Sequence, residues 1–387
     1  MRIRRVVILG STGSIGVNAL DVIARYPDRF QVIGLTAFNN TDLLRQQIRI
    51  FRPRYVAVKR QQIGPIRRQC ATKNFKILDV EKELDQLVGL AEVDLVVIAI
   101  SGVGALRPFL AAVRHGKLVA PANKEALVMA GDLLMDAARR HKATVIPIDS
   151  EQSAIFQCLQ GRKRKDLKKV YLTASGGPLA RVPRSKFNRL TVKQILQHPR
   201  WKMGRKITVD SANLMNKGFE VIEAQRLFSL ALDQIQIVIH PEAVIHSMVS
   251  FKDGSIMAQL GITDMRLPIQ FALSYPQCWA TDLPDVDFFF LKRLTFRQPD
   301  EKKFPCLGLA LESARQGKTY PCVLAAADDV AVDAFLNRRI PFQRIHAVVA
   351  EVLEKHQPPR SRLHLEDIYA AKDWAQITAQ RLIKRAT

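Results

Sequence analysis

Residues 210–223, DSANLMNKGFEVIE, combine amide, amine and carboxylate side chains at helical spacing. We expect one helix that is capped at Asp210 or Ser211, because a short side-chain oxygen there accepts a bond from an unpaired backbone N–H. Its polar stripe would hold four residues at i, i+3, i+4 and i+7, namely Asn213, Asn216, Lys217 and Glu220. Such a stripe suits an anion at the first turn and a metal ion or proton at the carboxylate. The alternative is an ordinary amphipathic helix with a solvated polar face.

A second group of acidic side chains follows an apolar run. Residues 144–148 are predicted to form a strand, and Asp149, Ser150 and Glu151 come directly after it. In an extended segment residues i and i+2 point the same way, so the two carboxylates would be presented together. Carboxylates this close repel unless a cation lies between them, and an all-oxygen ligand set favours Mg²⁺ or Mn²⁺. The alternative is a strand end that simply carries surface acids.

Two further loops offer groups that could bind an anion or cover a ligand. The loop from Ser175 to Pro178, SGGP, presents a hydroxyl and backbone N–H groups after a predicted strand. Residues 198–204, HPRWKMG, place Trp201 among basic residues without apolar periodicity. This pattern indicates either a mobile lid over a charged substrate or an irregular connection with a packed tryptophan.

The elements that must position these groups begin with a nucleotide-binding pattern. An apolar run at residues 5–10 leads into GSTGSIG and then into a helical pattern through residue 24. The three glycines would let the backbone approach a pyrophosphate, while Thr12, Ser14 and the helix N-terminus supply donors; a plain tight turn is the alternative. The second strand, 31–37, ends in AFNN without the acid that usually meets a free ribose 2′-hydroxyl, which favours NADP over NAD.

The rest of the chain divides into segments of different character. Runs at 93–100 and 117–122 continue a parallel sheet, and Asn123-Lys124-Glu125 stands at its ligand-binding edge. Residues 235–260 predict a half-open antiparallel sheet with a hairpin turn at 252–255, in which His240 and His246 are interpreted as structural. We therefore expect an α/β protein with a Rossmann-like parallel sheet at 1–148, a central α/β catalytic domain at 149–280, a linker at 281–304 and a C-terminal α-helical bundle at 305–387.

Composition narrows the class of protein. The chain carries 59 basic and 36 acidic residues, a net charge of +23, but the charge is dispersed and no nucleic-acid-binding motif accompanies it, so a nucleic-acid partner is not expected. Five cysteines without a CxxC pair indicate a reducing compartment. No apolar run approaches the roughly 20 residues that span a bilayer, and no signal peptide precedes the first strand. We expect a cytoplasmic protein without a membrane partner.

Taken together, several motifs resemble the 1-deoxy-D-xylulose 5-phosphate reductoisomerase family over essentially the whole chain. They are GSTGSIG, ANKEALVMAG, IPIDSEQSAIFQ, ASGGP, HPRWKMG, VDSANLMNKGFEVIEA, HPEAVIHSMV and FPCLGLALESARQGKTYP, in this order. The resemblance implies a homodimer that uses NADPH and a divalent metal to rearrange and reduce 1-deoxy-D-xylulose 5-phosphate to 2-C-methyl-D-erythritol 4-phosphate. This step belongs to the methylerythritol phosphate route to isoprenoid precursors.

The resemblance also implies roles for particular residues. The ligands of Mg²⁺ or Mn²⁺ would be Asp149, Glu151 and Glu220. NADPH would be held by Thr12, Gly13, Ser14, Ile15, Asn39, Asn40, Asn123, Glu125 and Gly204. The sugar phosphate would be held by Lys124, Ser150, Glu151, Ser175, His198, Trp201, Ser211, Asn216, Lys217 and Glu220. The residues implied to act in the chemistry are Lys124, Glu151, His198 and Glu220.

The chain departs from the family's usual pattern at three places. Phe38 and Asn39 stand where a small and a basic residue are usual, Gln152 stands where His is usual, and Asp328-Asp329 replaces an Asn-Glu pair.

Two other functions are compatible with the residues alone. One is an NADP-dependent dehydrogenase that acts on another phosphorylated substrate without rearrangement, and the other is a basic nucleic-acid-binding protein.

Overall fold

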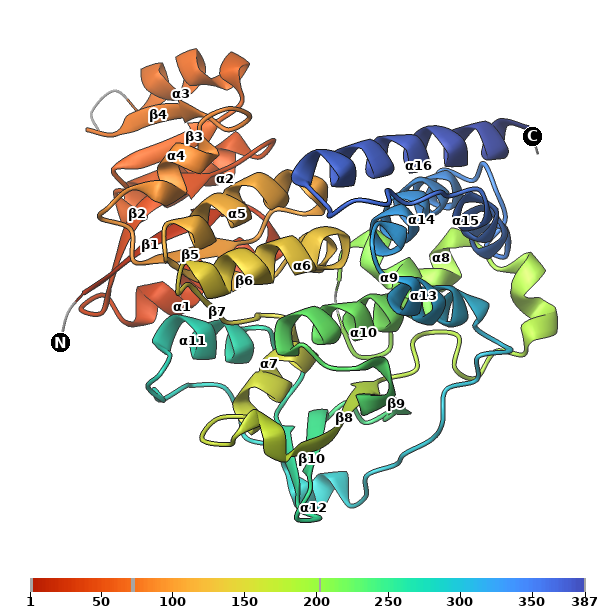
Figure 1. Ribbon diagram of the computed structural model, residues 1–387. Helices are drawn as coiled ribbons and strands as arrows, with labels where there is room; N and C mark the ends of the chain where they lie inside the picture. Colours follow the sequence, from red (N-terminus) through yellow and green to blue (C-terminus); the bar gives the residue numbers. More distant parts are fainter. Residues whose placement is uncertain (1–2, 71–73, 202, 386–387) are drawn as a thin grey trace. The chain divides into compact units, whose positions relative to one another are not determined.

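The computed structural model describes residues 3–70, 74–201 and 203–385, and Figure 1 shows the course of the chain. By its internal contacts the chain divides into two compact units. The first comprises residues 1–126, 134–153 and 264–282, and the second comprises 127–133, 154–263 and 283–387. None of the helices in the described residues is both long enough and apolar enough to cross a membrane.

A seven-stranded parallel sheet is the core of the first unit (Figure 1). In spatial order its strands are β4 (Lys76–Asp79), β3 (Tyr55–Val58), β2 (Phe30–Thr36), β1 (Arg4–Leu9), β5 (Leu95–Ile98), β6 (Leu118–Pro121) and β7 (Thr144–Val145). Residues Val6 to Leu9 of the central strand are fully buried, as expected where helices cover both faces of a parallel sheet. The chain order reverses between β1 and β5, which is where open α/β sheets bind ligands.

The helices of this unit alternate with its strands. They are α1 (Ser14–Arg25), α2 (Thr41–Phe51), α3 (Ile63–Gln69), α4 (Leu84–Gly89), α5 (Leu106–Arg114), most of α6 (Lys124–Arg140), the start of α7 (Ser150–Cys158), and α11 (Arg266–Ser274). The predicted Rossmann-like parallel sheet is therefore confirmed. Its short strands β3 and β4, of four residues each, were not predicted from the sequence.

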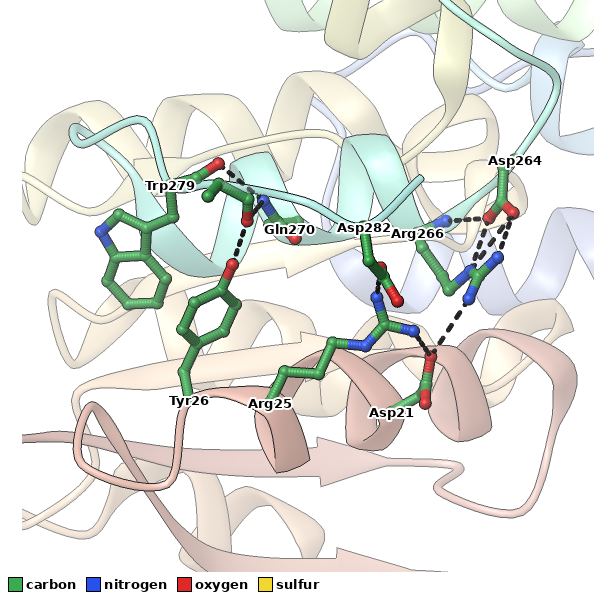
Figure 2. A network of polar contacts seen from close by, with 9 residues as sticks. Asp21, Arg25, Tyr26, Asp264, Arg266, Gln270, Trp279 and Asp282 are labelled. Carbon is green, nitrogen blue, oxygen red and sulfur yellow. Dashed lines mark hydrogen bonds and ion pairs between the residues drawn. The ribbon is translucent and has the colours of Figure 1, made fainter. Parts of the chain in front are cut away.

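Residues 264–282 pack on α1, from which they are far removed in sequence (Figure 2). Asp21 on α1 accepts ion pairs from Arg25 at 2.8 Å and from Arg266 at 3.5 Å, and Arg25 also pairs with Asp282. These side chains are substantially exposed, so each pair contributes at most about 1 kcal/mol. The pairs set the position of the segment more than they stabilise it.

Aromatic packing also holds this segment against α1 and β2. The ring of Trp279 lies 4.8 Å from that of Tyr26 and 5.3 Å from that of Phe30, and the Tyr26 hydroxyl donates to the Ala280 carbonyl. Gln270 on α11 donates to the carbonyls of Trp279 and Ala280 at 3.0 and 3.1 Å, which closes the turn (Figure 2). The C-terminal turn of α1 is thereby fixed.

A four-stranded sheet lies at one end of the second unit. Its strands in spatial order are β11 (Ile256–Leu260), β10 (Ile245–Phe251), β8 (Leu167–Ala174) and β9 (Ile235–Ile239). The hairpin between β10 and β11 is confirmed, but the prediction of an antiparallel sheet was wrong, because β8 and β9 pair in parallel. The chain reaches β9 from β8 through residues 175–234, a long crossover of the kind that parallel pairing requires.

Helices form the remainder of the second unit. They are α8 (Val192–Ile195), α9 (Arg205–Ala212), α10 (Met215–Phe228), α12 (Phe288–Leu291), α13 (Pro305–Gln316), α14 (Tyr320–Leu336), α15 (Arg344–Glu354) and α16 (Leu365–Arg385). α14 packs against α13, α15 and α16, which confirms the predicted C-terminal bundle (Figure 1, blue). α10 packs against both α9 and α13, so the helix with the candidate metal ligand rests on the bundle.

Candidate active site

The glycine-rich loop after β1 is shaped by close backbone approaches. Gly10 has φ +85°, and a Cβ there would lie 2.6 Å from the carbonyl oxygen of Ala99 at the end of β5. A Cβ on Gly16 would lie 2.3 Å from the carbonyl oxygen of Gly10. Both positions therefore require glycine for the fold itself. A Cβ on Gly13 would have only ordinary contacts, with the nearest atom at 3.5 Å, and Gly13 is exposed.

Two residues that sequence reasoning missed hold this loop. Thr36 at the end of β2 accepts hydrogen bonds from the backbone N–H groups of Gly10 and Ser11, at 2.8 and 2.9 Å. Gln47 on α2 bonds to the hydroxyl and the carbonyl of Ser11, at 2.7 and 2.8 Å, and is buried. No local pattern could reveal Gln47, since it lies 36 positions from its partner.

The first turn of α1 has no side-chain cap for its backbone N–H groups. The N-cap is Gly13, and no side chain caps the helix. Gly13 and Ser14 are exposed, while Thr12 and Ile15 are half-buried. Free N–H groups at a helix N-terminus with an exposed glycine ahead of them attract an anion such as a pyrophosphate.

The end of β6 carries Asn123 and Lys124 into α6. The side chain of Asn123 caps α6 by accepting from Ala126 N–H at 2.7 Å, and its amide donates to the Ile100 and Gly102 carbonyls at 2.5 and 3.0 Å. Asn123 therefore has a clear structural role at the sheet edge. Glu125 follows in the first turn and is half-buried.

Lys124 points to the acidic group that follows β7. Its Nζ lies 2.7 Å from Asp149 Oδ2, and both side chains are about one-tenth exposed or less. Ser150 Oγ donates to Glu151 Oε2 at 2.6 Å. The first unit therefore brings Lys124, Asp149, Ser150 and Glu151 together. The expected extended geometry was wrong, because Ser150 and Glu151 begin α7 and Ser153 N–H bonds to the Asp149 carbonyl at 2.8 Å.

The predicted single helix at 210–223 is two helices. α9 ends at Ala212, and α10 begins at Met215 after Leu214, which adopts a left-handed conformation with φ +63°. Asp210 and Ser211 lie inside α9 and cap nothing, so that expectation was wrong. Asn213 is not on the polar stripe either; it is the C-cap of α9, and its side chain accepts from Met215 N–H at 2.9 Å.

The stripe of three polar residues on α10 is retained. Asn216 donates to Glu220 Oε1 at 2.5 Å, and Lys217 donates to Glu220 Oε2. Lys217 is 3% exposed and Glu220 is 1% exposed, so the carboxyl group of Glu220 lies in the interior with an amine and an amide as its partners. Burial of such polar groups is costly unless their hydrogen bonds are satisfied.

The loop after β8 lies against α9 in the same unit. Gly176 and Gly177 have φ of +87° and +67°, and a Cβ on Gly177 would lie 2.4 Å from the carbonyl oxygen of Ser211. The close approach places the loop that carries Ser175 next to Ser211. Ser175 Oγ lies 3.3 Å from His198 Nε2.

Residues 198–201 fold back on the side chain of His198. Its Nδ1 accepts the backbone N–H of Trp201 at 2.9 Å and that of Arg200 at 3.2 Å, so the ring proton belongs on Nε2, toward Ser175. Burial lowers the pKa of His198, which keeps the ring neutral. Trp201 is half-buried with its ring 6.3 Å from that of His246, Gly204 is the N-cap of α9, and Lys202 lies outside the described residues.

Two histidines interpreted as structural from the sequence, His240 and His246, have backbone carbonyls beside their rings. His240 is fully buried; its Nδ1 lies 3.0 Å from the Thr295 carbonyl and 3.1 Å from Glu242 Oε2. His246 Nε2 lies 3.3 Å from the Ile262 carbonyl.

A buried ionic cluster between α9 and α14 was not predicted from the sequence. Lys206 Nζ lies 2.8 Å from Asp210 Oδ2, 3.0 Å from Asp328 Oδ2 and 3.2 Å from Asp329 Oδ1. Asp210 and Asp328 are almost fully buried. Burial raises the pKa of Asp210 well above its ordinary value, and the neighbouring Asp328 raises it further while Lys206 opposes the change. The cluster ties the helix after the 198–204 loop to α14.

These elements define a class of protein: an α/β enzyme with a Rossmann-type nucleotide loop, a lysine–carboxylate group at its sheet edge, and a second unit with a buried carboxylate and a hydroxyl-lined loop. Family models for 1-deoxy-D-xylulose 5-phosphate reductoisomerase match residues 6–131 and, for its C-terminal domain, 145–228; a model of the DXP reductoisomerase C-terminal domain matches 260–378.

Whole-chain comparisons agree with the family models. The chain is 46% identical over 383 residues to the 1-deoxy-D-xylulose 5-phosphate reductoisomerase of Pelotomaculum thermopropionicum, covering 98% of this chain and 99% of that protein. It is 48% identical over 374 residues to the enzyme of Moorella thermoacetica, covering 96% of each. The chain belongs to the 1-deoxy-D-xylulose 5-phosphate reductoisomerase family.

Solved structures share this fold at full length. The Zymomonas mobilis reductoisomerase in complex with NADPH matches with a TM-score of 0.93 at 39% identity, over 99% of both chains. A DOX-P reductoisomerase in complex with NADPH, fosmidomycin and magnesium matches with a TM-score of 0.92 at 37% identity, over 99% of this chain and 98% of that one. The predicted fold class and family are thus confirmed.

Proposed function

We propose that the chain converts 1-deoxy-D-xylulose 5-phosphate to 2-C-methyl-D-erythritol 4-phosphate with NADPH and Mg²⁺ or Mn²⁺, as a step of isoprenoid precursor biosynthesis. Near-complete alignment with relatives of that name supports the reaction. The observation in this chain that carries most weight is Glu220, an almost fully buried carboxylate held by Asn216 and Lys217. A solved relative that contains NADPH, fosmidomycin and magnesium supports both cofactors.

The proposed metal ligands are Asp149, Glu151 and Glu220. Their donors are all carboxylate oxygens, which suit a hard divalent ion rather than zinc. Each carboxylate has a polar neighbour: Lys124 pairs with Asp149, Ser150 donates to Glu151, and Asn216 and Lys217 donate to Glu220. When bound, the ion supplies the Lewis acidity that polarises a keto group next to a hydroxyl.

The protein's own groups bind and orient the substrate. We assign the phosphate end to Ser175, Ser211, Asn216 and Lys217, because a hydroxyl-bearing glycine turn lies against Ser211 on α9, and α10, which carries the lysine, packs on α9. Anchoring the phosphate contributes remote binding energy and fixes a small, flexible molecule for reaction. Lys124 is assigned to stabilise negative charge that develops on a substrate oxygen.

His198 and Trp201 are assigned to the substrate side of the 198–204 loop. A neutral His198 that donates from Nε2 can bind a substrate oxygen while its Nδ1 holds the loop backbone. Closure of this loop would exclude water from the reaction. Ser150 and Glu151 would contact the substrate where it meets the metal.

NADPH is assigned to the carboxyl edge of the parallel sheet. Thr12, Gly13, Ser14 and Ile15 would hold the pyrophosphate at the open N-terminus of α1, and Asn39 and Asn40 would lie by the adenosine ribose. Asn123, Glu125 and Gly204 would lie toward the nicotinamide, the ring that supplies the hydride for the reduction.

We also propose a division into domains and a cellular setting. The division is 1–148 for NADPH, 149–280 for catalysis, 281–304 for the linker and 305–387 for the bundle; separate family models for 6–131 and 145–228 support a division of the chain in this region. All five cysteines are free, and four are buried, which supports a reducing, cytoplasmic location. We propose no nucleic-acid partner, because the net charge of +23 is dispersed along the chain.

Homodimerisation is proposed on two apolar surfaces of the second unit. Phe288, Phe289 and Phe290 on α12 are 58, 94 and 86% exposed. β11 is an edge strand of its sheet, and Ile256 and Met257 on it are 55 and 45% exposed. Exposed aromatic groups and unpaired apolar edge strands are features of protein interfaces.

The deciding experiment follows NADPH absorbance with 1-deoxy-D-xylulose 5-phosphate and Mn²⁺, with and without a chelator. We expect oxidation that stops in the chelator and returns when excess Mn²⁺ or Mg²⁺ is added. Oxidation that persists in the chelator would indicate an ordinary dehydrogenase. No oxidation by folded, metal-loaded protein would contradict the proposed function.

A further inference from the structure

The turn after β2 has no cation of its own, yet a lysine from the neighbouring strand lies on it. Phe38 and Asn39 follow β2, and Lys59 follows β3. Lys59 Nζ lies 2.9 Å from Asn39 Oδ1 and 3.8 Å from the centroid of the Phe38 ring. One ammonium group is therefore held by a carbonyl dipole and an aromatic face.

Backbone pairing fixes this arrangement. β2 and β3 are parallel neighbours, and Ala37 N–H bonds to the Ala57 carbonyl at 3.0 Å, so the two strand ends lie side by side. Asn40 caps α2 by accepting from Leu43 N–H at 3.0 Å. The turn is thus anchored at both ends, and Lys59 is placed over it before any ligand arrives.

The charge of Lys59 is not neutralised. Within the described residues its side chain contacts only neutral groups, and Arg60 beside it is exposed. The nearest carboxylate in sequence after the turn, Asp42, is paired with Arg45 on α2. This corner of the sheet therefore presents an ammonium without a counter-ion.

The location decides what anion would meet that ammonium. In a Rossmann-type sheet the adenosine ribose lies at the carboxyl end of the second strand, where an acid selects the free 2′-hydroxyl and a base selects the 2′-phosphate. Here Asn39 and Asn40 supply only neutral groups, and the cation comes from the turn after the third strand.

We propose that Lys59 recognises the 2′-phosphate of NADPH and sets the preference for NADPH over NADH. The inference rests on the proposed use of NADPH and names the residue that selects it. Phe38 acts as a positioning residue, because its ring supports the ammonium and limits the conformations of a long side chain. On phosphate binding the ammonium exchanges the Asn39 carbonyl for a charged oxygen.

The test compares binding of adenosine 2′,5′-bisphosphate and of 5′-AMP by calorimetry, using wild type, Lys59→Gln and Lys59→Arg. A lost charge-assisted contact corresponds to a weakening of about 10- to 100-fold. We expect Lys59→Gln to weaken the bisphosphate by that factor and to leave 5′-AMP unchanged, while Lys59→Arg retains most of the affinity. Lys76→Gln is the matched control, since Lys76 is an exposed lysine at the amino end of β4, on the opposite edge of the sheet.

Kinetics give a second measurement. The ratio of kcat/KM for NADPH to that for NADH should fall in Lys59→Gln by the same factor and fall further in Lys59→Glu. Unchanged bisphosphate affinity and an unchanged ratio in Lys59→Gln would overturn the role of Lys59 while leaving the reaction intact. Wild-type protein that binds neither NADPH nor the bisphosphate would overturn both this inference and the proposed function.

Discussion

The proposed chemistry depends more on the carboxylate of Glu220 than on any other single functional group. It is 1% exposed and is satisfied by an ammonium and an amide on its own helix. A neighbour pair at i, i+3 and i, i+4 can be formed by any helix, so the pairing alone would not require burial. Lys217 and Glu220 are nevertheless both buried, which is the reason for testing Glu220 as a proposed metal ligand.

Replacement of Glu220 by Gln tests this assignment. The amide keeps the size of the side chain but removes the charge, so we expect Mn²⁺ affinity to fall by at least about 100-fold, since even outer-shell changes cost 10- to 100-fold. Calorimetric Mn²⁺ titration and NADPH oxidation at saturating metal would measure it. Glu312→Gln, an exposed glutamate on α13, is the control. Unchanged Mn²⁺ affinity would remove Glu220 from the ligand set.

Asp210 gives a residue-scale prediction about pH. Its pKa is raised in the folded protein by burial and by Asp328, from an ordinary value of 3.8. The folded state thus retains a proton that the unfolded chain releases, so stability falls as pH rises above about 4, until the raised pKa is passed. Asp328→Asn removes the adjacent acid and lowers the folded pKa of Asp210.

We therefore expect Asp328→Asn to be more stable than wild type at pH 8 by about 1 kcal/mol or more, and to gain less at pH 5. Denaturant unfolding at the two pH values would measure the difference. Asp333→Asn on the same helix is the control, because Asp333 is 61% exposed and pairs with Arg339 at the surface. A loss of stability at pH 8 would mean that Lys206 needs both carboxylates charged.

At the scale of elements, substitutions in the glycine loop can separate effects on packing from effects on ligand binding. Gly16→Ala would place a Cβ 2.3 Å from the Gly10 carbonyl oxygen, so the loop or α1 must move. Gly13→Ala meets nothing closer than 3.5 Å and has no left-handed backbone. The two substitutions add the same methyl group to one motif with different structural consequences.

We expect Gly16→Ala to lower the melting temperature and to abolish NADPH binding. Gly13→Ala should keep the melting temperature of the wild type and weaken NADPH, because the methyl group occupies the space that the pyrophosphate needs. Differential scanning fluorimetry with and without NADPH would measure both effects. Full NADPH affinity in Gly13→Ala would place the pyrophosphate elsewhere.

The sequence predicted elements whose signal is local. The apolar runs that become β1, β2, β5 and β6, the glycine loop after β1 and the helical bundle at 305–387 each have a signal in consecutive residues, and these predictions were confirmed. The break between α9 and α10 was not predictable, because it requires Leu214 at φ +63°, a conformation that costs a non-glycine residue about 1–2 kcal/mol. Tertiary packing of α9 and α10 on the bundle imposes that break.

Contacts between distant residues were equally hidden. The parallel pairing of β8 with β9 and the meeting of Lys206 with Asp328 depend on how the second unit folds. Neither has a pattern in the linear chain, whereas the types of the candidate site residues do. The sequence therefore offers a pattern from which candidate site residues can be proposed, but none from which these two contacts could be predicted.

At the scale of the whole molecule, the exposed aromatic groups on α12 need an explanation. Three consecutive phenylalanines with 58, 94 and 86% exposure leave a large apolar surface in water. Burial of apolar surface contributes about 25 cal/mol per Å², so covering this surface would stabilise an assembly substantially. The edge strand β11 offers a second apolar surface in the same unit.

A charge in the middle of the α12 surface should therefore dissociate the proposed homodimer. Phe289→Glu places a carboxylate where burial would cost several kcal/mol, so we expect a monomer at micromolar concentration where the wild type is dimeric. Light scattering coupled to size exclusion would measure the mass. Ile377→Glu is the matched control, because Ile377 is 49% exposed on α16, and it should leave the mass unchanged. A wild-type monomer, or a dimeric Phe289→Glu variant, would show that α12 is not the interface.

The activity of the monomeric variant tests what the dimer is for. If the dimer serves only to cover apolar surface, the variant will still oxidise NADPH. Lost activity with an unchanged fold would show that the assembly also shapes the active site.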